Sequence, residues 1–348
     1  MTNGQQAKES RHEGGRSGPD TAMRAIVQQA YGPADVLHLA HVPRPAIADD
    51  HVLVRVHAAG MDRGTWHVTT GLPYALRLVY GFRAPRNPVP GMDFAGTVEA
   101  IGAKVTRFGV GDQVFGTGKG TFAEYAAARE SQLALKPANI SFAQAAVVPV
   151  SACTALQALR AGGVVPDRNN RHRKVLVTGA SGGVGSYAVQ FAKAAGAEVT
   201  AVCSAGKADL VRSLGADHVI DYAKQDFADG SGRYDVIIDI AGNPGVSRLR
   251  RALTPDGTAV ITGGEEGGSW TGSMDRQLRA LVVSPFIRQR FTMIVGSQTA
   301  ADLEYLAGLL EAGTIVPAID RTFPLDQVPE AMRYFDAGKA RGKVAITI

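Results

Sequence analysis

Cysteine is scarce in this 348-residue chain, which contains only Cys153 and Cys203. Two cysteines cannot build a disulfide framework or a multi-cysteine metal site, so we expect a reducing, cytoplasmic environment. Long apolar runs are also lacking, because the longest, such as residues 143–155, fall well short of the roughly 18 uncharged residues of a membrane-spanning helix. The sequence therefore predicts no membrane partner.

Neither sign of charge dominates, since 37 Lys and Arg face 32 Asp and Glu, a formal net charge of +5. Basic runs such as residues 168–174 and 288–290 are typical of solvated surface, and no aromatic residues are interleaved with them. We therefore expect no nucleic-acid partner. The first 22 residues are polar and glycine-rich, without the apolar core of a signal peptide, and predict a disordered tail.

A chain of 348 residues is expected to form two domains. Its first half has the pattern of a strand-rich domain. Short alternating or β-branched runs, separated by glycine turns, predict strands at 23–28, 52–58, 94–101, 113–115, 122–127 and 133–135. This pattern favours a partly open β-barrel. Residues 61–90 form a long irregular segment of the kind that lines a site, and residues 142–161 are expected to be helical with a break at Pro149.

The pattern changes at Lys174 to alternating strands and helices. The predicted strands are 175–177, 198–203, 218–221, 234–240 and 258–262, and the helices between them are 184–195, 207–214 and 245–253. Such alternation specifies a parallel sheet with right-handed crossovers. Helices at 300–311 and 328–335 and a strand at 343–348 complete the chain. Residues 270–291 alternate apolar and basic positions, and could close a cleft, meet another subunit or form a surface helix.

A glycine-rich turn follows the first of these parallel strands, in the sequence "KVLVTGASGGVGSYAVQ". Gly179 permits a tight exit from the strand, Gly182 and Gly183 let a pyrophosphate approach the main chain, and Gly185 lets the following helix pack closely. The helix N-terminus supplies unpaired N–H groups to the phosphates. The turn therefore predicts a dinucleotide site. About twenty residues later, "VCSAGK" offers Ser204 and Lys207 and no acidic residue, which favours NADPH over NADH.

Several segments resemble the medium-chain dehydrogenase/reductase family, in the family's order: "GMDFAGTVEAIGAKVTRFGVGDQVFG", "GTFAEYA", "KPANISFAQAAVVPVSACTALQAL", "TGASGGVG" and "LGADHVIDY". The resemblance implies an α/β fold with a partly open, GroES-like catalytic β-barrel formed by residues 23–150 and 320–348. Residues 151–319 would form a doubly wound, parallel-sheet Rossmann domain, and the active site would lie in the cleft. Members of this family usually form homodimers.

The zinc ligands of many family members are missing here. Zinc members begin the first segment with Gly-His-Glu, where this chain has Gly91-Met92-Asp93, and their catalytic cysteine would fall near Met61 and Asp62. A catalytic zinc needs three protein ligands and an open position. The chain therefore resembles the zinc-independent, quinone oxidoreductase-like branch, and we predict no metal.

The resemblance also implies cofactor contacts, residue by residue. Those facing the pyrophosphate would be Ser181, Gly182, Gly183, Val184 and Gly185; those around the 2′-phosphate Ser204, Lys207 and Tyr222; and those along the nicotinamide half Thr154, Gly242, Gly263 and Gly264.

Without zinc the substrate must carry its own electron sink, as a quinone or an α,β-unsaturated carbonyl does. We therefore expect hydride transfer from NADPH to such a small molecule. His67 and Tyr74 are the candidate proton donors, with Tyr80 and Asp62 behind them, although each also fits a packing or capping role. The alternatives are a zinc-free alcohol or ketone dehydrogenase and an NADPH-binding redox sensor without turnover.

Overall fold

The computed structural model describes residues 22–165, 172–263, 268–272, 280, 282 and 287–348. The predicted tail therefore lies outside the described residues except for Ala22, which begins strand β1 (Ala22–Val27). β1 pairs antiparallel with β2 (His38–Pro43), a strand that the sequence did not predict, in a separate two-stranded sheet.

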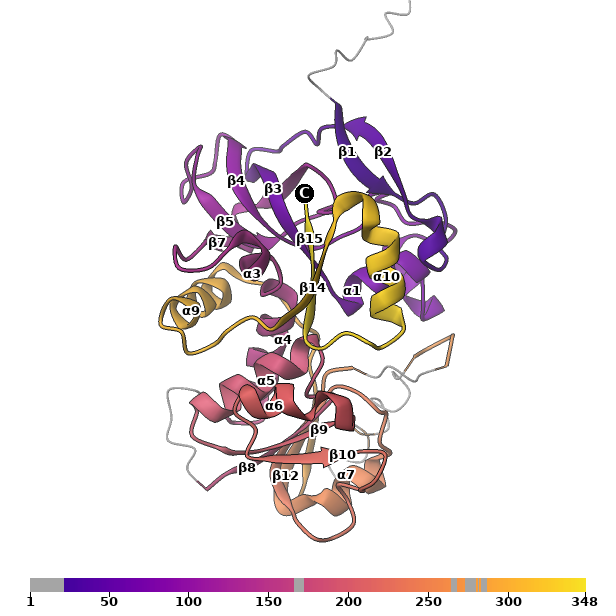
Figure 1. Ribbon diagram of the computed structural model, residues 1–348, viewed down its shortest axis with the longest axis vertical. Coiled ribbons are helices and arrows are strands. Elements are labelled where there is room, and N and C mark those ends of the chain that lie inside the picture. The colour runs from indigo at the N-terminus through magenta and orange to yellow at the C-terminus, as the bar shows by residue number, and fades with distance from the viewer. Residues whose placement is uncertain (1–21, 166–171, 264–267, 273–279, 281, 283–286) are drawn as a thin grey trace, which may run out of the picture.

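A second sheet fills the upper half of the molecule in Figure 1. Its strand order is β14-β15-β3-β4-β5-β7, with β6 paired to β3. The strands are β3 (His51–Met61), β4 (Asp93–Ile101), β5 (Gln113–Thr117), β6 (Tyr125–Arg129), β7 (Leu133–Leu135), β14 (Ile319–Pro324) and β15 (Lys343–Thr347). Alternating Val52, Val54 and Val56 of β3 are buried against Phe94. In this described strand order β14 and β7 are edges, so the sheet is not a closed barrel.

A six-stranded, fully parallel sheet fills the lower half, in the order β10-β9-β8-β11-β12-β13 (Figure 1). Its strands are β8 (Lys174–Thr178), β9 (Glu198–Cys203), β10 (His218–Asp221), β11 (Tyr234–Asp239), β12 (Leu253–Ile261) and β13 (Arg290–Met293). The chain runs outward from β8 through β9 to β10, and then continues on the other side of β8 at β11. The carboxyl ends of β8 and β11 therefore flank the topological switch point, where such sheets bind ligands.

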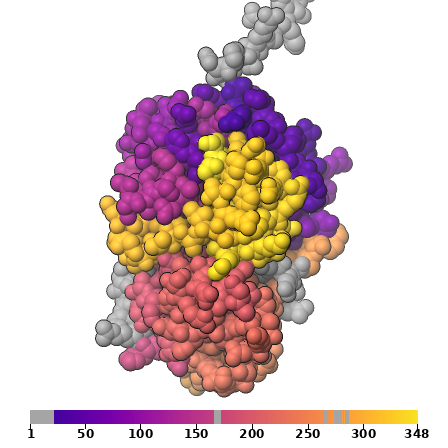
Figure 2. Space-filling model, viewed as in Figure 1, coloured from indigo at the N-terminus to yellow at the C-terminus, as the bar shows by residue number. Residues whose placement is uncertain are grey.

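The helices around these sheets are largely those expected. They are α3 (Phe142–Ala146), α4 (Pro149–Ala161), α5 (Gly183–Ala194), α6 (Ala208–Ser213), α7 (Val246–Ala252), α9 (Ala300–Glu311) and α10 (Val328–Asp336). Figure 2 shows the C-terminal part of the chain, in yellow, between the N-terminal strands and the lower part of the molecule. Because β15 pairs with β3, the chain returns to its first large sheet after completing the parallel one.

These findings confirm the predicted α/β fold class, and they correct several details. The segment 61–90 is not wholly irregular, because Asp62 caps helix α1 (Arg63–Thr70) and a second short helix, α2 (Arg77–Tyr80), follows. The strand predicted at 122–127 begins only at Tyr125. Strands β13 and β14 were not predicted. The domain boundaries at 150/151 and 319/320 stay predictions, and most of segment 270–291 lies outside the described residues.

One buried hydrogen bond joins helix α5, which follows the first parallel strand, to the segment between α3 and α4. Tyr187 of α5 is fully buried, and its hydroxyl donates to the carbonyl of Val147, which separates α3 from α4, at 3.2 Å. Tyr187→Phe would leave that carbonyl without this donor, so we expect the free energy of unfolding to fall by about 1–2 kcal/mol. Chemical denaturation measures this, and Tyr222→Phe, at an exposed position, is the matched control. Equal stability of all three proteins would contradict the expectation.

Among the described residues no helix combines the length and apolar character needed to cross a bilayer.

Candidate active site

A threonine ties together the ends of the two central parallel strands. Thr178, the last residue of β8, donates its hydroxyl to Oδ1 of Asp239, the last residue of β11, at 3.0 Å. The hydroxyl oxygen of Thr178 in turn accepts the backbone N–H groups of Ile240 (2.9 Å) and Ala241 (3.2 Å). These bonds hold the two strand exits together, so the glycine turn after β8 and Gly242 after β11 begin from one fixed point.

The glycine turn combines close packing at its base with open space at its tip. Gly179 has φ of +62°, and a Cβ atom on Gly185 would lie 2.2 Å from the Gly179 carbonyl oxygen, so a larger residue at Gly185 would displace the turn. At Gly182, by contrast, a Cβ would meet only one atom within 4 Å, the Gly179 oxygen at 3.3 Å. Gly182 also begins the twelve-residue helix α5 with no side-chain cap. An open turn at an uncapped helix N-terminus fits a pyrophosphate.

A buried lysine that the sequence analysis missed lies beside this turn. Lys343, the first residue of β15, is 2% exposed, and its Nζ donates to Ser151 Oγ (2.9 Å) and to the Met61 carbonyl (3.1 Å). A Cβ on Gly183 would lie 3.8 Å from that Nζ. A lysine ammonium at this point favours an anionic group on the turn. In the sequence, the only signal is one charged residue opening an otherwise apolar terminal strand.

The residues predicted around the 2′-phosphate gather at the ends of β9 and β10. Ser204 follows β9 directly, and its carbonyl accepts the N–H of Lys207 at 3.0 Å. The N–H of Tyr222 donates to the last residue of β9, and its side chain is 63% exposed. Lys207 Nζ donates to the carbonyls of Gly338 and Ala340, both at 2.8 Å. Lys207 therefore also anchors the segment that leads into β15.

The residues predicted along the nicotinamide half come from three elements. Thr154 lies on α4, where its hydroxyl donates to the Val150 carbonyl at 2.7 Å. Gly242 has φ of +86°, and a Cβ atom there would have no other atom within 4 Å, while Gly263 follows β12. Gly264 lies outside the described residues. Contacts between these residues and a cofactor stay predictions.

His67 lies on α1, and it is a neutral acceptor in this setting. Its Nδ1 is bonded to the Leu72 carbonyl, which can only accept, so Nδ1 carries the hydrogen. Burial lowers the pKa of His67, although the Leu72 bond opposes this shift. The imidazole is therefore neutral at physiological pH, and Nε2 holds a lone pair. His67 can pass on a proton only after Nε2 has received one.

Tyr74 belongs to an apolar surface. Its ring meets that of Trp270 at a centroid distance of 5.4 Å, and its N–H donates to the Ser269 carbonyl at 2.8 Å. Trp270 itself is exposed, as are three large apolar side chains that follow Tyr74 along the chain, namely Leu78, Val79 and Phe82. We call these four residues and Tyr74 the apolar mouth. The Tyr74 hydroxyl has no catalytic partner that the structure identifies, so its predicted catalytic role stays a prediction.

Two buried carboxyl groups, those of Asp62 and Asp93, lie in the two segments that the sequence analysis aligned with the metal-binding segments of zinc-containing proteins. Asp93 Oδ1 accepts the N–H of Val150 at 3.0 Å, and Asp62 Oδ1 accepts that of Thr65 at 2.8 Å. Burial, together with repulsion from Asp62, raises the pKa of Asp93 well above its usual range, while Lys343 opposes the shift. In the part of the chain that the structure describes, no three His, Cys, Asp or Glu side chains are grouped to hold a metal ion.

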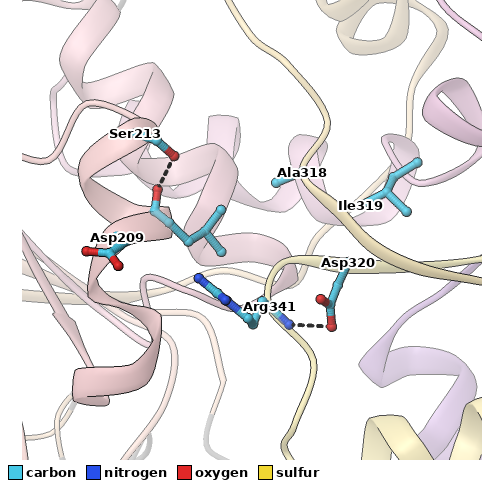
Figure 3. Close-up of a pocket in the computed structure, with 7 residues that line it drawn as sticks. Asp209, Ser213, Ala318, Ile319, Asp320 and Arg341 are labelled. Carbon is cyan, nitrogen blue, oxygen red and sulfur yellow. Dashed lines mark hydrogen bonds between the residues drawn. The ribbon is translucent and has the colours of Figure 1, made fainter.

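A separate cleft of about 420 Å³ lies between α6 and the C-terminal segment. Figure 3 shows Asp209 and Ser213 of α6 across from Asp320 and Arg341, whose N–H donates to the Asp320 carboxylate at 3.1 Å. None of the predicted site residues lines this cleft. This cleft is therefore separate from the predicted dinucleotide site, which is identified by the main-chain geometry of the glycine turn.

A parallel sheet with an open glycine turn at its switch point, joined to a strand-rich sheet, is typical of α/β proteins that bind a dinucleotide. Comparison with known proteins gives the family. Residues 48–138 match the alcohol dehydrogenase GroES-like domain, and residues 214–346 match the zinc-binding dehydrogenase domain. The chain belongs to the medium-chain dehydrogenase/reductase family, and it is an oxidoreductase that uses a nicotinamide cofactor.

Three similar proteins cover nearly the whole chain. The 2-methylene-furan-3-one reductase of Solanum lycopersicum is 34% identical, over 93% of this chain and 79% of its own length. The chloroplastic NADPH-dependent alkenal/one oxidoreductase of Arabidopsis thaliana is 33% identical, with the same coverage of 93% and 79%. The solved structure of a quinone oxidoreductase from Coxiella burnetii is 27% identical, with a TM-score of 0.82 and coverage of 94% and 99%.

The raised pKa of Asp93 predicts a pH-dependent stability. Native Asp93 keeps its proton to higher pH than the unfolded chain, where Asp titrates near about 3.9. Its contribution is therefore complete below about pH 4, and the free energy of unfolding falls as pH rises through the native pKa. We expect Asp93→Asn to flatten this fall, as measured by denaturant titrations from about pH 4 upward.

Asp217 provides the matched control, because its ion pair with Lys193 and its bond to the Val199 N–H lower its pKa. Asp217→Asn should leave the fall toward high pH intact. An Asp93→Asn protein with the wild-type pH slope would contradict the buried, proton-bearing state of Asp93.

Proposed function

We propose that this oxidoreductase transfers a hydride from NADPH to a quinone or an α,β-unsaturated carbonyl, without zinc. The observation that carries the proposal is the open glycine turn, with the ammonium of Lys343 buried beside it. The exposed apolar mouth is the second feature that supports it. The turn suits a phosphorylated dinucleotide, and an exposed aromatic and aliphatic surface suits a flat, apolar acceptor. The printed names of the similar proteins, which include alkenal/one and quinone oxidoreductases, support the same acceptors.

The preference for NADPH rests on the charge at the end of β9. Lys207 and Ser204 lie where the second ribose belongs in such folds, and no carboxylate of the β9–α6 connection occupies that place. A lysine can neutralise a 2′-phosphate, whereas an acidic residue there would repel it. The Arabidopsis relative is named as NADPH-dependent, which supports this choice.

The proposal that zinc is absent rests on the donor atoms. Met92 offers a thioether, which is a poor ligand for zinc, and Asp62 and Asp93 each already accept a backbone N–H with one oxygen. Lys343 also interacts electrostatically with Asp93, and its positive charge opposes a divalent cation there. The family model that covers residues 214–346 is described as zinc-binding, but the residues in question all precede that region.

In this mechanism the bound NADPH supplies the hydride. Gly182 and Gly183 would hold the pyrophosphate, Lys343 would balance its charge, and Thr154, Gly242 and Gly263 would border the nicotinamide half. The apolar mouth would admit the acceptor and exclude water. A neutral His67 would accept and pass on the proton that the reduced acceptor requires.

The test is anaerobic oxidation of NADPH against a panel of quinones, enones and simple aliphatic ketones, with zinc content measured on the same protein. We expect turnover of quinones or enones, little turnover of ketones, and substoichiometric zinc. Ketone turnover alone would identify a zinc-free alcohol or ketone dehydrogenase. Tight NADPH binding with no turnover of any acceptor would identify a redox sensor.

A second experiment addresses the 2′-phosphate. Lys207→Ala should weaken NADPH binding at least about tenfold while changing NADH binding much less, because only NADPH carries the phosphate. Binding is measured by nicotinamide fluorescence, and Lys104→Ala, at an exposed lysine in the connection between β4 and β5 that is paired with Asp49, is the control. Equal losses for both cofactors would mean that Lys207 acts only by anchoring Gly338 and Ala340. The homodimer and the cytoplasmic location stay predictions.

A further inference from the structure

Asp62 and Asp93 lie close together on one face of the first large sheet. Asp93, at the start of β4, is in register with Gly60 of β3 and with Thr117 of β5. Asp62 continues the extended backbone of β3, with φ of −140° and ψ of 171°, two residues beyond Gly60. Alternate residues of a strand share a face, so Asp62 is a diagonal neighbour of Asp93. Gly60 has no side chain, and therefore places nothing between them.

Each carboxyl group has one oxygen bonded and one oxygen without a partner. The backbone N–H groups of Val150 and Thr65 satisfy Oδ1 of Asp93 and of Asp62. Both Oδ2 atoms are buried, with no hydrogen-bond partner among the described residues. Asp93 is 0% exposed and Asp62 4% exposed. A buried, ionised oxygen without a donor is unfavourable, whereas a protonated carboxyl supplies a donor itself.

The local charges also favour one retained proton. Lys343 is buried and interacts with Asp93, so two ionised carboxylates and one ammonium would leave one negative charge in excess inside the protein. Two close carboxylates do not both ionise readily in such a setting. Among the interactions that the described residues show, Asp93 interacts with Asp62, Lys343, Cys153 and Tyr187, and Asp62 interacts with Asp93, His67 and Tyr80. Lys343 is the one cation among these groups.

We propose that Asp62 and Asp93 share one proton at neutral pH, and that this pair is the proton reservoir that recharges His67. The proton lies between the two Oδ2 atoms, directly or through one water molecule. The shared proton is independent of the acceptor, whereas the recharging of His67 rests on the proposed function.

The proton balance of the reaction gives the pair its role. Reduction of an enone or a quinone adds one hydride from NADPH and one proton to the acceptor. His67 is neutral, and its single N–H is held by the Leu72 carbonyl, so it has no proton of its own to give. One proton passes from the pair to Nε2 and from there to the anionic oxygen of the reduced acceptor. Both carboxyls are then ionised until solvent returns a proton to them.

Infrared spectroscopy of the cofactor-free protein tests the shared proton without any turnover. We expect the C=O band of a protonated carboxyl at neutral pH, lost in Asp93→Asn and weakened in Asp62→Asn. Burial of Asp93 persists in Asp62→Asn, but the repulsion from Asp62 is removed and Lys343 can balance ionised Asp93, so Asp93 carries its proton in a smaller fraction of molecules. Asn keeps the oxygen that accepts the backbone N–H, so both caps are retained. Asp217→Asn, which removes an ion-paired carboxylate, should leave the band unchanged.

Three results would overturn the shared proton. They are a wild-type protein without the band, an Asp62→Asn protein that keeps it in full, and a crystal structure with a cation between the two carboxyls. The second would assign the proton to Asp93 alone.

The pH dependence of kcat tests the recharging of His67. In the wild-type protein kcat should fall as pH rises through the apparent pKa at which the pair loses its proton. In Asp62→Asn and Asp93→Asn we expect kcat lower by on the order of tenfold or more, without that fall, and KM for NADPH within about twofold. Asp217→Asn should retain the wild-type profile.

The two proposals fail in distinguishable ways. Wild-type kinetics in both pair variants, with the infrared band lost in Asp93→Asn and weakened in Asp62→Asn, would overturn the recharging of His67 alone. If no acceptor is turned over by any of the proteins, the proposed function fails, and the infrared result still decides whether the proton is shared.

Discussion

The buried ammonium of Lys343 holds the end of β3, the start of α4 and the glycine turn together, and the rest of the structure depends on these contacts. A lysine can be buried only where its donors are satisfied, and here the acceptors come from two different places, the end of β3 and the start of α4. The same side chain lies against the helix N-terminus at Gly183. Strand β15 must therefore reach this point in register, and the neighbouring N–H of Gly342 confirms the fit by donating to the Ser181 carbonyl at 2.8 Å.

This arrangement makes the glycine turn depend on both ends of the chain. The turn leaves β8 at a position held by Thr178 and Asp239, but its outer side is held by residues more than 150 positions later. Lys207 adds a third attachment, because it binds the carbonyls of Gly338 and Ala340. Residues 338–343 therefore hold the nucleotide turn, the β9 exit and the first sheet together.

The sequence predicted those features that local physics determines. Strand–glycine–helix alternation identifies a parallel sheet, and Gly179, with its positive φ, is required by the chain path itself. The missed features depend on distant partners. The only local signal for Lys343 is its charge at the start of an apolar strand, and its role cannot be predicted locally because its acceptors lie at Met61 and Ser151. The pairing of Asp62 with Asp93 required the register of β3 with β4. Helix α1 could have been expected, because Asp62 and the later Gly71 are ordinary capping residues.

Charge balance explains why a pocket without suitable zinc ligands can still bury two acids. In a metal site the cation compensates the anionic ligands. Here Met92 replaces a charged or imidazole donor, and compensation has to come from Lys343 and from the N–H groups at the start of α4 and α1. Lys343 balances one negative charge, and the two N–H groups bond one oxygen of each acid. The second negative charge and the two Oδ2 atoms have no such compensation among the described residues. A proton is the smallest group that can make up the remainder, and unlike a metal ion it can leave and return once in every reaction cycle.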